Sequence, residues 1–139
     1  MAEPEVFARV SEAPPDRAAL EAFVRTPADG ALVVFEGVVR DHDHGVAVSA
    51  LDYEAHPDAE RFLAEACHEV AARTGLRVAA WHRVGSLRIG DVALLAVVAA
   101  AHRADAFAAC AQLVDRIKES TPIWKRQHLD GGVTEWVGL

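Results

Sequence analysis

The second half of the chain contains the run Val92-Ala93-Leu94-Leu95-Ala96-Val97-Val98-Ala99-Ala100-Ala101, in which every residue is apolar. A strand that is apolar at consecutive positions is buried on both of its faces, so this run predicts the central strand of a sheet. It is too short to span a bilayer, which takes roughly 20 residues in a helix. The fold is therefore expected to be built around this strand.

Three helices are predicted from apolar residues that recur at helical spacing. The first follows an N-cap at Asp16, the second begins after Pro57 and ends at Gly75, and the third runs from about Ala104 to Thr121, where the following proline disfavours helical geometry. Their predicted buried faces consist of Leu20, Phe23 and Val24; of Ala59, Phe62, Leu63, Ala66, Cys67, Val70 and Ala71; and of Phe107, Cys110, Ala111, Val114 and Ile117.

Five further strands are predicted from alternating or β-branched apolar residues, at 5–10, 31–39, 46–55, 76–84 and 133–137. Segments 85–91 and 130–132 are rich in glycine and predict turns. Short turns between consecutive strands favour an α+β fold, with a largely antiparallel sheet and flanking helices. With 139 residues the chain is expected to form one domain, 1–139, whose core needs neither disulfides nor a metal.

Composition narrows the class of protein. The net charge of −7 argues against a general nucleic-acid binder, which needs a basic surface. The acidic N-terminus lacks the apolar run of a signal peptide. Cys67 and Cys110 lie in apolar helical stretches and are expected to be free thiols in a reducing cytoplasm, although the sequence leaves a pairing between them open. We expect a cytoplasmic protein that binds no membrane.

The chain has only two lysines, Lys118 and Lys125, whereas arginine fills the other twelve basic positions. Arginine is always charged, but the pKa of a lysine falls readily on burial, so a lysine can act as a base, a nucleophile or an anchor for an anion. The alternative is that two lysines sit by chance on a solvated helix end. Their proximity, around Pro122 and Trp124, favours catalysis.

A basic region surrounds these lysines. Residues 102–128 carry a charge of +2 and the rest of the chain −9. Within that region His102 and Arg103 stand where the central strand passes into the third helix, and a helix start with a guanidinium group is suited to a phosphate. Arg40 ends another predicted strand: taken alone it is interpreted as a solvated strand end, and together with His102 and Arg103 it is a candidate for the same site. This pattern predicts a site for a small anion rather than for a polyanion.

Other polar segments carry weaker signals. Asp41-His42-Asp43-His44 has metal-capable side chains but no second cluster to complete a ligand set, so a solvated loop is expected. His82-Arg83 precedes a glycine and is interpreted as structural, part of a turn. Trp124 is a candidate wall of a pocket. The sequence has no Walker, dinucleotide-binding, nucleophile-elbow or H-E-x-x-H motif, and we expect neither a cofactor nor a metal.

The motifs together resemble one family. They are Phe35-x-Gly37-x-x-Arg40, Leu51-x-Tyr53-Glu54, His82-Arg83-x-Gly85-x-x-x-x-Gly90-Asp91, His102-Arg103-x-x-Ala106-Phe107, Lys118, and Pro122-Ile123-Trp124-Lys125. In this order they resemble the large, catalytic subunit of molybdopterin synthase over nearly the whole chain. The resemblance implies an α/β-hammerhead fold and a homodimer with one small ubiquitin-like carrier subunit at each end, a heterotetramer.

The resemblance also implies the reaction. The carrier ends in Gly-Gly bearing a thiocarboxylate, and two sulfurs pass from it to cyclic pyranopterin monophosphate, leaving the dithiolene of molybdopterin. Lys118 and Lys125 are implied to be catalytic. The implied substrate contacts are Arg40, His102 and Arg103, and the candidate pocket walls are Phe35, Trp124 and Arg126. Gln127 departs from the pattern because a glutamate is usual there, and segment 51–56 lacks a second aromatic residue.

Two other functions remain open from the residues alone. One is a non-catalytic dimeric module that binds a small phosphorylated ligand through Arg40, His102 and Arg103. The other is a scaffold that docks the tail of a partner by strand addition, with Lys125 and Arg126 meeting a carboxylate. The first gives no reason for two lysines in a chain that otherwise uses arginine, and the second uses Lys125 only to meet that carboxylate.

Overall fold

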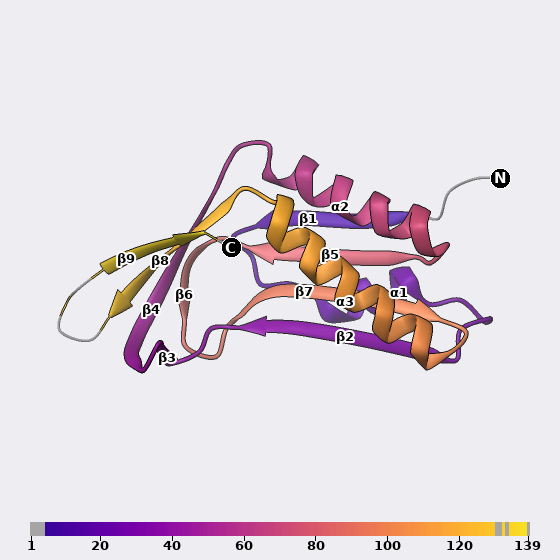
Figure 1. The fold of residues 1–139 in the computed structure, drawn as a ribbon, viewed down its shortest axis with the longest axis horizontal. Helices are drawn as coiled ribbons and strands as arrows, with labels where there is room; N and C mark the ends of the chain where they lie inside the picture. Colours follow the sequence, from indigo (N-terminus) through magenta and orange to yellow (C-terminus); the bar gives the residue numbers. More distant parts are fainter. Residues whose placement is uncertain (1–4, 130–131, 133, 139) are drawn as a thin grey trace.

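The computed structural model describes residues 5–129, 132 and 134–138. Its strands form two sheets, one running the length of the molecule and one standing at its end (Figure 1). The helices are α1 (Arg17–Val24), α2 (Ala59–Thr74) and α3 (Arg103–Ser120). In the described part of the chain, no helix is long and apolar enough to cross a membrane.

The first sheet is built around the apolar run, which forms β7 (Val92–Ala100). Its antiparallel neighbours are β5 (Val78–Arg83) and β2 (Ala31–Val38), and β1 (Val6–Ser11) lies parallel to β5, giving the order β1-β5-β7-β2. From Ala93 onward every residue of β7 is buried, so the predicted central strand is confirmed. The apolar, β-branched strand predicted over 31–39 was interpreted as buried, but β2 is an edge of the sheet: only β7 pairs with it among the described strands, and its residues are half-buried or exposed.

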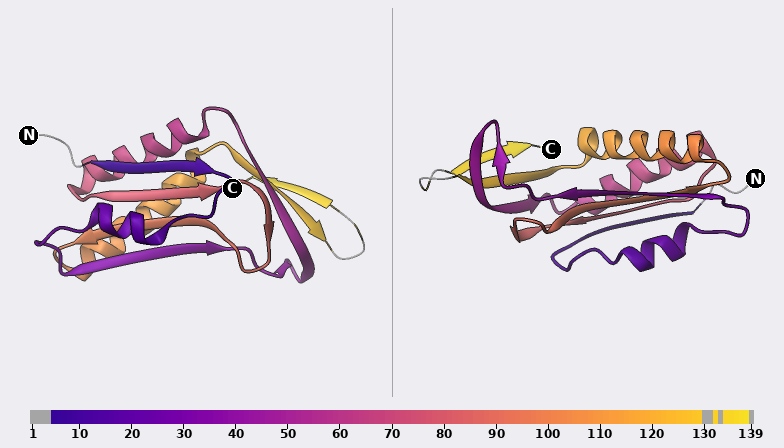
Figure 2. Two further views of the ribbon diagram at one scale, coloured as in Figure 1. Left: turned by 180° about the vertical axis from the view of Figure 1, so that it is seen from behind. Right: turned by 90° about the horizontal axis from the view of Figure 1, so that it is seen from below.

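Helices cover both faces of this sheet. α2 and α3 lie on one face and α1 lies on the other (Figure 2). The alternation of β5 shows the division: Val78 and Ala80 pack with α2 and α3, whereas Ala79 and Trp81 pack with α1. Each face thus has its own apolar core, and residue 82 of the same strand continues the face that α3 covers.

The helix boundaries agree with the predicted caps. Asp16 accepts a hydrogen bond from the Ala19 backbone N–H at 3.2 Å, and Gly75 ends α2 at a φ of 74°, a left-handed conformation that glycine adopts without strain. α3 extends from Arg103, one residue earlier than expected, to Ser120, and Thr121 caps it. Cys67 and Cys110 are buried free thiols, as expected.

The predicted buried face of α3 was partly wrong. Phe107 is 61% exposed and Ala111 is also exposed, whereas Ala106, Ala109 and Leu113 are buried with Cys110, Val114 and Ile117. Small residues at positions 106 and 109 allow the helix to lie close against the sheet and α2. The prediction gave most weight to large apolar side chains, so it included Phe107 in the buried face and left out the small residues Ala106 and Ala109.

The second sheet is antiparallel and centres on β4 (Val46–Ala55). β4 pairs with β3 (His42–Asp43), β6 (Gly85–Arg88) and β8 (Ile123–Leu129), and β9 (Thr134–Gly138) pairs with β8. β6 lies in the segment predicted as a turn. Asp130, Gly131 and Val133, from the predicted last turn and strand, lie outside the described residues.

The α+β class is confirmed, and among the described strand pairs only β1–β5 is parallel. The two sheets meet around an apolar cluster that contains Val39, Leu51, Tyr53, Leu87 and Ile123. The C-terminal end of α3 reaches the same junction, and β8 leaves from it. The junction therefore brings together segments from both halves of the sequence.

Candidate active site

A cavity of about 260 Å³ opens at the junction of the two sheets. Its lining comes from β2 and the residues after it, β4, β5, β7, β8 and the last turn of α3. The lining residues are Phe35, Gly37, Val38, Val39, Arg40, Leu51, Tyr53, His82, Ala93, Leu94, Lys118, Lys125 and Gln127. The cavity thus combines apolar walls with a few polar groups, the usual composition of a small-molecule site.

Strand register explains how β4 and β8 contribute. Tyr53 lies opposite Lys125 and Leu51 opposite Gln127 in the antiparallel pair. Side chains directly opposite each other on such strands share a face of the sheet. All four side chains therefore point into the cavity, and the residues between them point to the other face.

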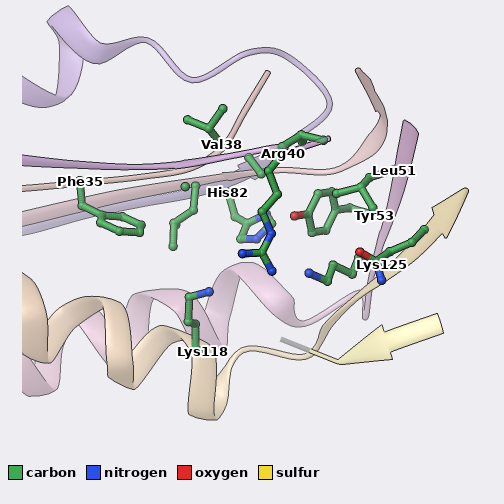
Figure 3. Close-up of a pocket in the computed structure, with 13 residues that line it drawn as sticks. Phe35, Val38, Arg40, Leu51, Tyr53, His82, Lys118 and Lys125 are labelled. Carbon is green, nitrogen blue, oxygen red and sulfur yellow. The ribbon is translucent and has the colours of Figure 1, made fainter. Parts of the chain in front are cut away.

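Three cations converge in this cavity. Arg40 extends from the segment after β2, Lys118 from α3 and Lys125 from β8, and their charged ends point toward one another (Figure 3). Burial lowers the pKa of Lys125, and the nearby charges of Lys118 and Arg40 lower it further, while Asp43 and Glu135 oppose the shift. The structure therefore brings together three of the predicted site residues, with Phe35 as a wall.

Asp43 holds one side of this cation cluster. Its carboxylate accepts a hydrogen bond from Gln127 Nε2 at 2.8 Å and forms an ion pair with Arg40 at 3.1 Å. The Gln127 hydrogen bond is the main cause that lowers the pKa of Asp43. The expectation of a solvated loop was wrong for this residue, because β3 pairs with β4 and leaves the Asp43 side chain only 15% exposed. Asp43 thus places a carboxylate directly beside Gln127.

Replacing Asp43 by asparagine should lower the pKa of Lys125. The substitution removes a negative charge that favours the ammonium form, while burial, Lys118 and Arg40 still disfavour it. The limb of the pH–activity profile that reports the titration of Lys125 should therefore move toward lower pH in Asp43→Asn, whether the active form of Lys125 is protonated or neutral. Because the chain has two lysines, protein labelled with ¹³C at lysine Cε should give two NMR signals that report both titrations directly.

Asp41→Asn is the matched control for this experiment. Asp41 lies two residues away, is well exposed and pairs with His42 rather than with a lysine. It should leave the Lys125 titration unchanged. A rise in the pKa of Lys125 in Asp43→Asn, or an equal shift in both variants, would contradict the role of Asp43.

Trp124 and Arg126 lie outside the cavity. They alternate with Lys125 along β8 and so point to the opposite face of the sheet. There Arg126 forms an ion pair with Asp52 at 3.2 Å and lies over the Trp136 ring, while Trp124 lines a separate shallow depression with Glu54 and Trp136. Of the three candidate pocket walls, the structure places Phe35 alone in the cavity.

His102 and Arg103 lie at the far end of α3. His102 is the residue before the helix, and both side chains are exposed beside Gly30 and Ala31. Fifteen residues of helix separate Arg103 from Lys118, which corresponds to about 22 Å along the axis. One chain therefore does not bring them to Arg40 and the lysines. The basic region predicted from sequence is divided between the two ends of this helix.

Sequence reasoning missed four polar residues of the site: Asp43, Tyr53, His82 and Gln127. Arg83 does serve the turn, donating to the Glu12 backbone carbonyl and pairing with Asp91, but His82 lines the cavity. One signal was available, because the strand period places residue 82 on the same face as Val78 and Ala80. A polar residue at the end of a buried apolar face is a candidate for a pocket.

Comparisons with known proteins place this geometry in context. A family model described as MoaE protein matches residues 10–120. A molybdopterin synthase catalytic subunit from Staphylococcus carnosus is 43% identical over 118 residues, which cover 84% of this chain and 78% of that protein. Subunit 1 from Mycobacterium tuberculosis, with the same description, is 38% identical over 136 residues, 95% of this chain and 90% of that protein.

Solved structures are similar in fold as well. The crystal structure of molybdopterin synthase from Staphylococcus aureus has a TM-score of 0.85 and 37% identity, over 96% of this chain and 97% of that one. A complex of subunits 1 and 2 of molybdopterin-converting factor from Helicobacter pylori has a TM-score of 0.67 and 20% identity, over 99% and 90%. At that identity the second likeness concerns the fold alone.

Proposed function

This chain belongs to the MoaE family, and from that membership we propose that the cavity between its two sheets is the sulfur-transfer site of a molybdopterin synthase. The protein is the catalytic subunit of that enzyme and acts in molybdenum cofactor biosynthesis, where it converts a precursor to molybdopterin. The precursor is cyclic pyranopterin monophosphate. The sulfur comes from the C-terminal thiocarboxylate of a small ubiquitin-like carrier. The two free thiols fit a cytoplasmic location.

One observation carries this proposal: Arg40, Lys118 and Lys125 converge in a cavity with apolar walls. The reaction joins two anions, a thiocarboxylate and a cyclic phosphate, which repel each other unless cations lie between them. Cations inside a partly dehydrated cavity act more strongly than cations in water. The site is therefore suited to holding both anions in contact.

The lysines have a second task. Sulfur addition to the pterin and loss of oxygen from it require proton transfers, which need a group that exchanges protons near neutral pH. Burial and like charges lower the pKa of Lys125 toward that range, and an arginine in its place would stay protonated. We assign Lys118 and Lys125 to this acid–base and anion-holding work, and Arg40 to the substrate.

The carrier is proposed to enter through its tail. An extended Gly-Gly end is narrow enough to thread between side chains, and its terminal thiocarboxylate needs a cation to meet it. A second subunit agrees with the description of the relatives as a catalytic subunit, and the Helicobacter pylori complex that shares the fold contains subunits 1 and 2 of molybdopterin-converting factor.

Deleting the Gly-Gly tail of the carrier should weaken its association with this chain markedly. The tail is expected to supply the contacts that reach Lys118 and Lys125, which the globular part of the carrier does not provide. Calorimetric titration of intact and truncated carrier into the protein measures the difference. Equal affinities would place the interface away from the cavity.

A second copy of this chain is proposed to complete the site. His102 and Arg103 offer a guanidinium group and a helix start to a phosphate, yet about 22 Å of helix separates them from Lys118 in one chain. In a symmetric homodimer the distal end of one α3 can approach the cavity of the other protomer. The two parts of the basic region then meet across the interface, and a carrier at each end gives a heterotetramer.

Reconstitution tests the proposed function. The purified protein is mixed with thiocarboxylated carrier and cyclic pyranopterin monophosphate, and dithiolene product is measured. Product formation supports the enzyme. Binding of the pterin phosphate without any product would favour the alternative, a non-catalytic dimeric module for a small phosphorylated ligand.

A further inference from the structure

His82 is a buried histidine in the wall of the cavity. It lies at the end of β5, on the face that Val78 and Ala80 bury against α2 and α3, and it is 2% exposed. The close-up shows its side chain beside Tyr53 in the cavity (Figure 3). The Tyr53 and His82 rings pack edge to face with centroids 5.2 Å apart, which holds the imidazole in one orientation.

Hydrogen bonding determines which nitrogen carries the proton. His82 Nδ1 lies 2.8 Å from the backbone carbonyl oxygen of Arg83. A carbonyl oxygen only accepts, so Nδ1 donates and holds the ring proton. In the neutral ring Nε2 then has a free lone pair, on the edge of the imidazole that faces away from the backbone. Among the residues that the structure describes, none donates a hydrogen bond to this atom.

The surroundings keep this ring neutral. Burial lowers the pKa of His82 to about 4, and the charge of Lys118 adds to the shift, although the bond to Arg83 opposes it. At neutral pH the imidazole therefore accepts through Nε2 rather than donating. Nε2 is not among the fully buried side-chain atoms that lack a partner, so in a side chain that is 2% exposed it keeps an opening to the cavity, where a ligand can pair with it.

The charged groups of the cavity have the opposite character to this neutral ring. As cations, Arg40, Lys118 and Lys125 donate hydrogen bonds and accept none. These groups suit phosphate and thiocarboxylate oxygens or sulfur. An anion would instead be repelled by the lone pair of His82 Nε2. This atom suits a part of the substrate that offers a hydrogen, such as a ring N–H or an amino group.

We propose that His82 is a substrate-binding residue whose neutral Nε2 accepts a hydrogen bond from an N–H group of the fused nitrogen heterocycle, while the cations of the cavity hold the anionic groups. The inference deepens the proposed function and rests on it. It makes His82 a specificity determinant: a phosphate ester without such a heterocycle leaves Nε2 unpaired.

Two amide substitutions separate the two nitrogens of His82. Asparagine reaches only as far as Nδ1, so His82→Asn keeps a donor for the Arg83 carbonyl and removes the acceptor at the Nε2 position. Glutamine is longer, so His82→Gln can place its carbonyl oxygen near that position. Calorimetry then measures the affinity of wild type and both variants for cyclic pyranopterin monophosphate and, as a probe of the cations alone, for inorganic phosphate.

His82→Asn should weaken pterin binding at least ~10-fold, the effect of leaving a buried donor without its acceptor. Phosphate binding should stay as in wild type, and His82→Gln should recover most of the pterin affinity. Thermal melting shows whether each variant is folded. If His82→Asn does not fold, the comparison of His82→Gln with wild type still tests the acceptor. Wild-type pterin affinity in His82→Asn, or equal losses for pterin and phosphate, would overturn the inference.

Activity distinguishes this inference from the proposed function. If the wild-type protein forms dithiolene product and His82→Asn has the same KM for the pterin as wild type, the role of His82 is overturned and the proposed function stands. Wild-type protein that neither binds the pterin nor forms product overturns the proposed function and the inference with it. A raised KM in His82→Asn, with recovery in His82→Gln, supports both.

Discussion

Replacing Lys118 or Lys125 by alanine should lower the rate of dithiolene formation at least ~100-fold, the usual effect of losing an acid–base group. Each substitution removes one of the three cations that converge in the cavity. The repulsion between thiocarboxylate and phosphate is then less compensated, and one proton-exchanging group is lost. Single-turnover rates with preformed carrier complex separate this effect from any change in carrier binding.

Lys118→Arg and Lys125→Arg should be nearly as damaging as the alanine variants. Arginine keeps the charge but not the compact ammonium or the adjustable pKa, and its planar group presents its donors in a different geometry. Arg73→Ala, an exposed position in the last turn of α2, is a control that should keep wild-type activity. Near-normal product formation by both arginine variants would contradict the argument from the two lysines.

Arg103→Ala should weaken the affinity for cyclic pyranopterin monophosphate by about 1.5–3 kcal/mol, the contribution of a hydrogen bond to a charged group. The apparent KM should rise, and docking of the carrier should stay largely intact because the lysine end of α3 meets its tail. Substrate and carrier binding are measured separately in the same variant. Loss of carrier binding with normal pterin binding would assign Arg103 to the partner instead.

Mixed dimers extend this test to the second copy. In a dimer that combines a Lys118→Ala chain with an Arg103→Ala chain, one of the two sites is intact if Arg103 serves the partner's cavity. About half of the dimers in a random mixture are of this mixed kind, so about a quarter of all sites should be intact. Combining Lys118→Ala with Lys125→Ala is the matched control and should regain none, because both lysines line the cavity of their own chain. Equal results from the two mixtures would mean that Arg103 does not act across a dimer.

Much of the fold could be predicted from local patterns. The run 92–101 was recognisable as the central strand because continuous apolarity requires burial on both faces. Asp16 and Gly75 marked helix ends because a capping carboxylate and a left-handed glycine act within a few residues. Local signals failed for Phe107, since the face that a helix buries depends on the elements that it meets.

The candidate site was predicted in part. Lys118 and Lys125 stood out because a chain that otherwise uses arginine keeps them, which is a property of composition. Composition also marked residues 102–128 as basic, but it did not show that α3 carries the two halves of that region to opposite ends. Trp124 and Arg126 were grouped with Lys125 as neighbours in sequence, whereas strand alternation separates them in space.

The sequence by itself determined the three helices, the strands of the first sheet and the two residues that stand out chemically, because helix caps, strand periodicity and composition are local properties. It did not predict β3, β6 or β8 as strands, since their pairing with β4 depends on the junction of the two sheets. Only the tertiary structure decided which polar groups meet: Asp43 beside Gln127, Tyr53 opposite Lys125, and His82 against Tyr53. These residues come from four strands, and each contact joins two positions that lie far apart in the chain. The register between strands and the junction of the two sheets set them, and both depend on packing over the whole molecule.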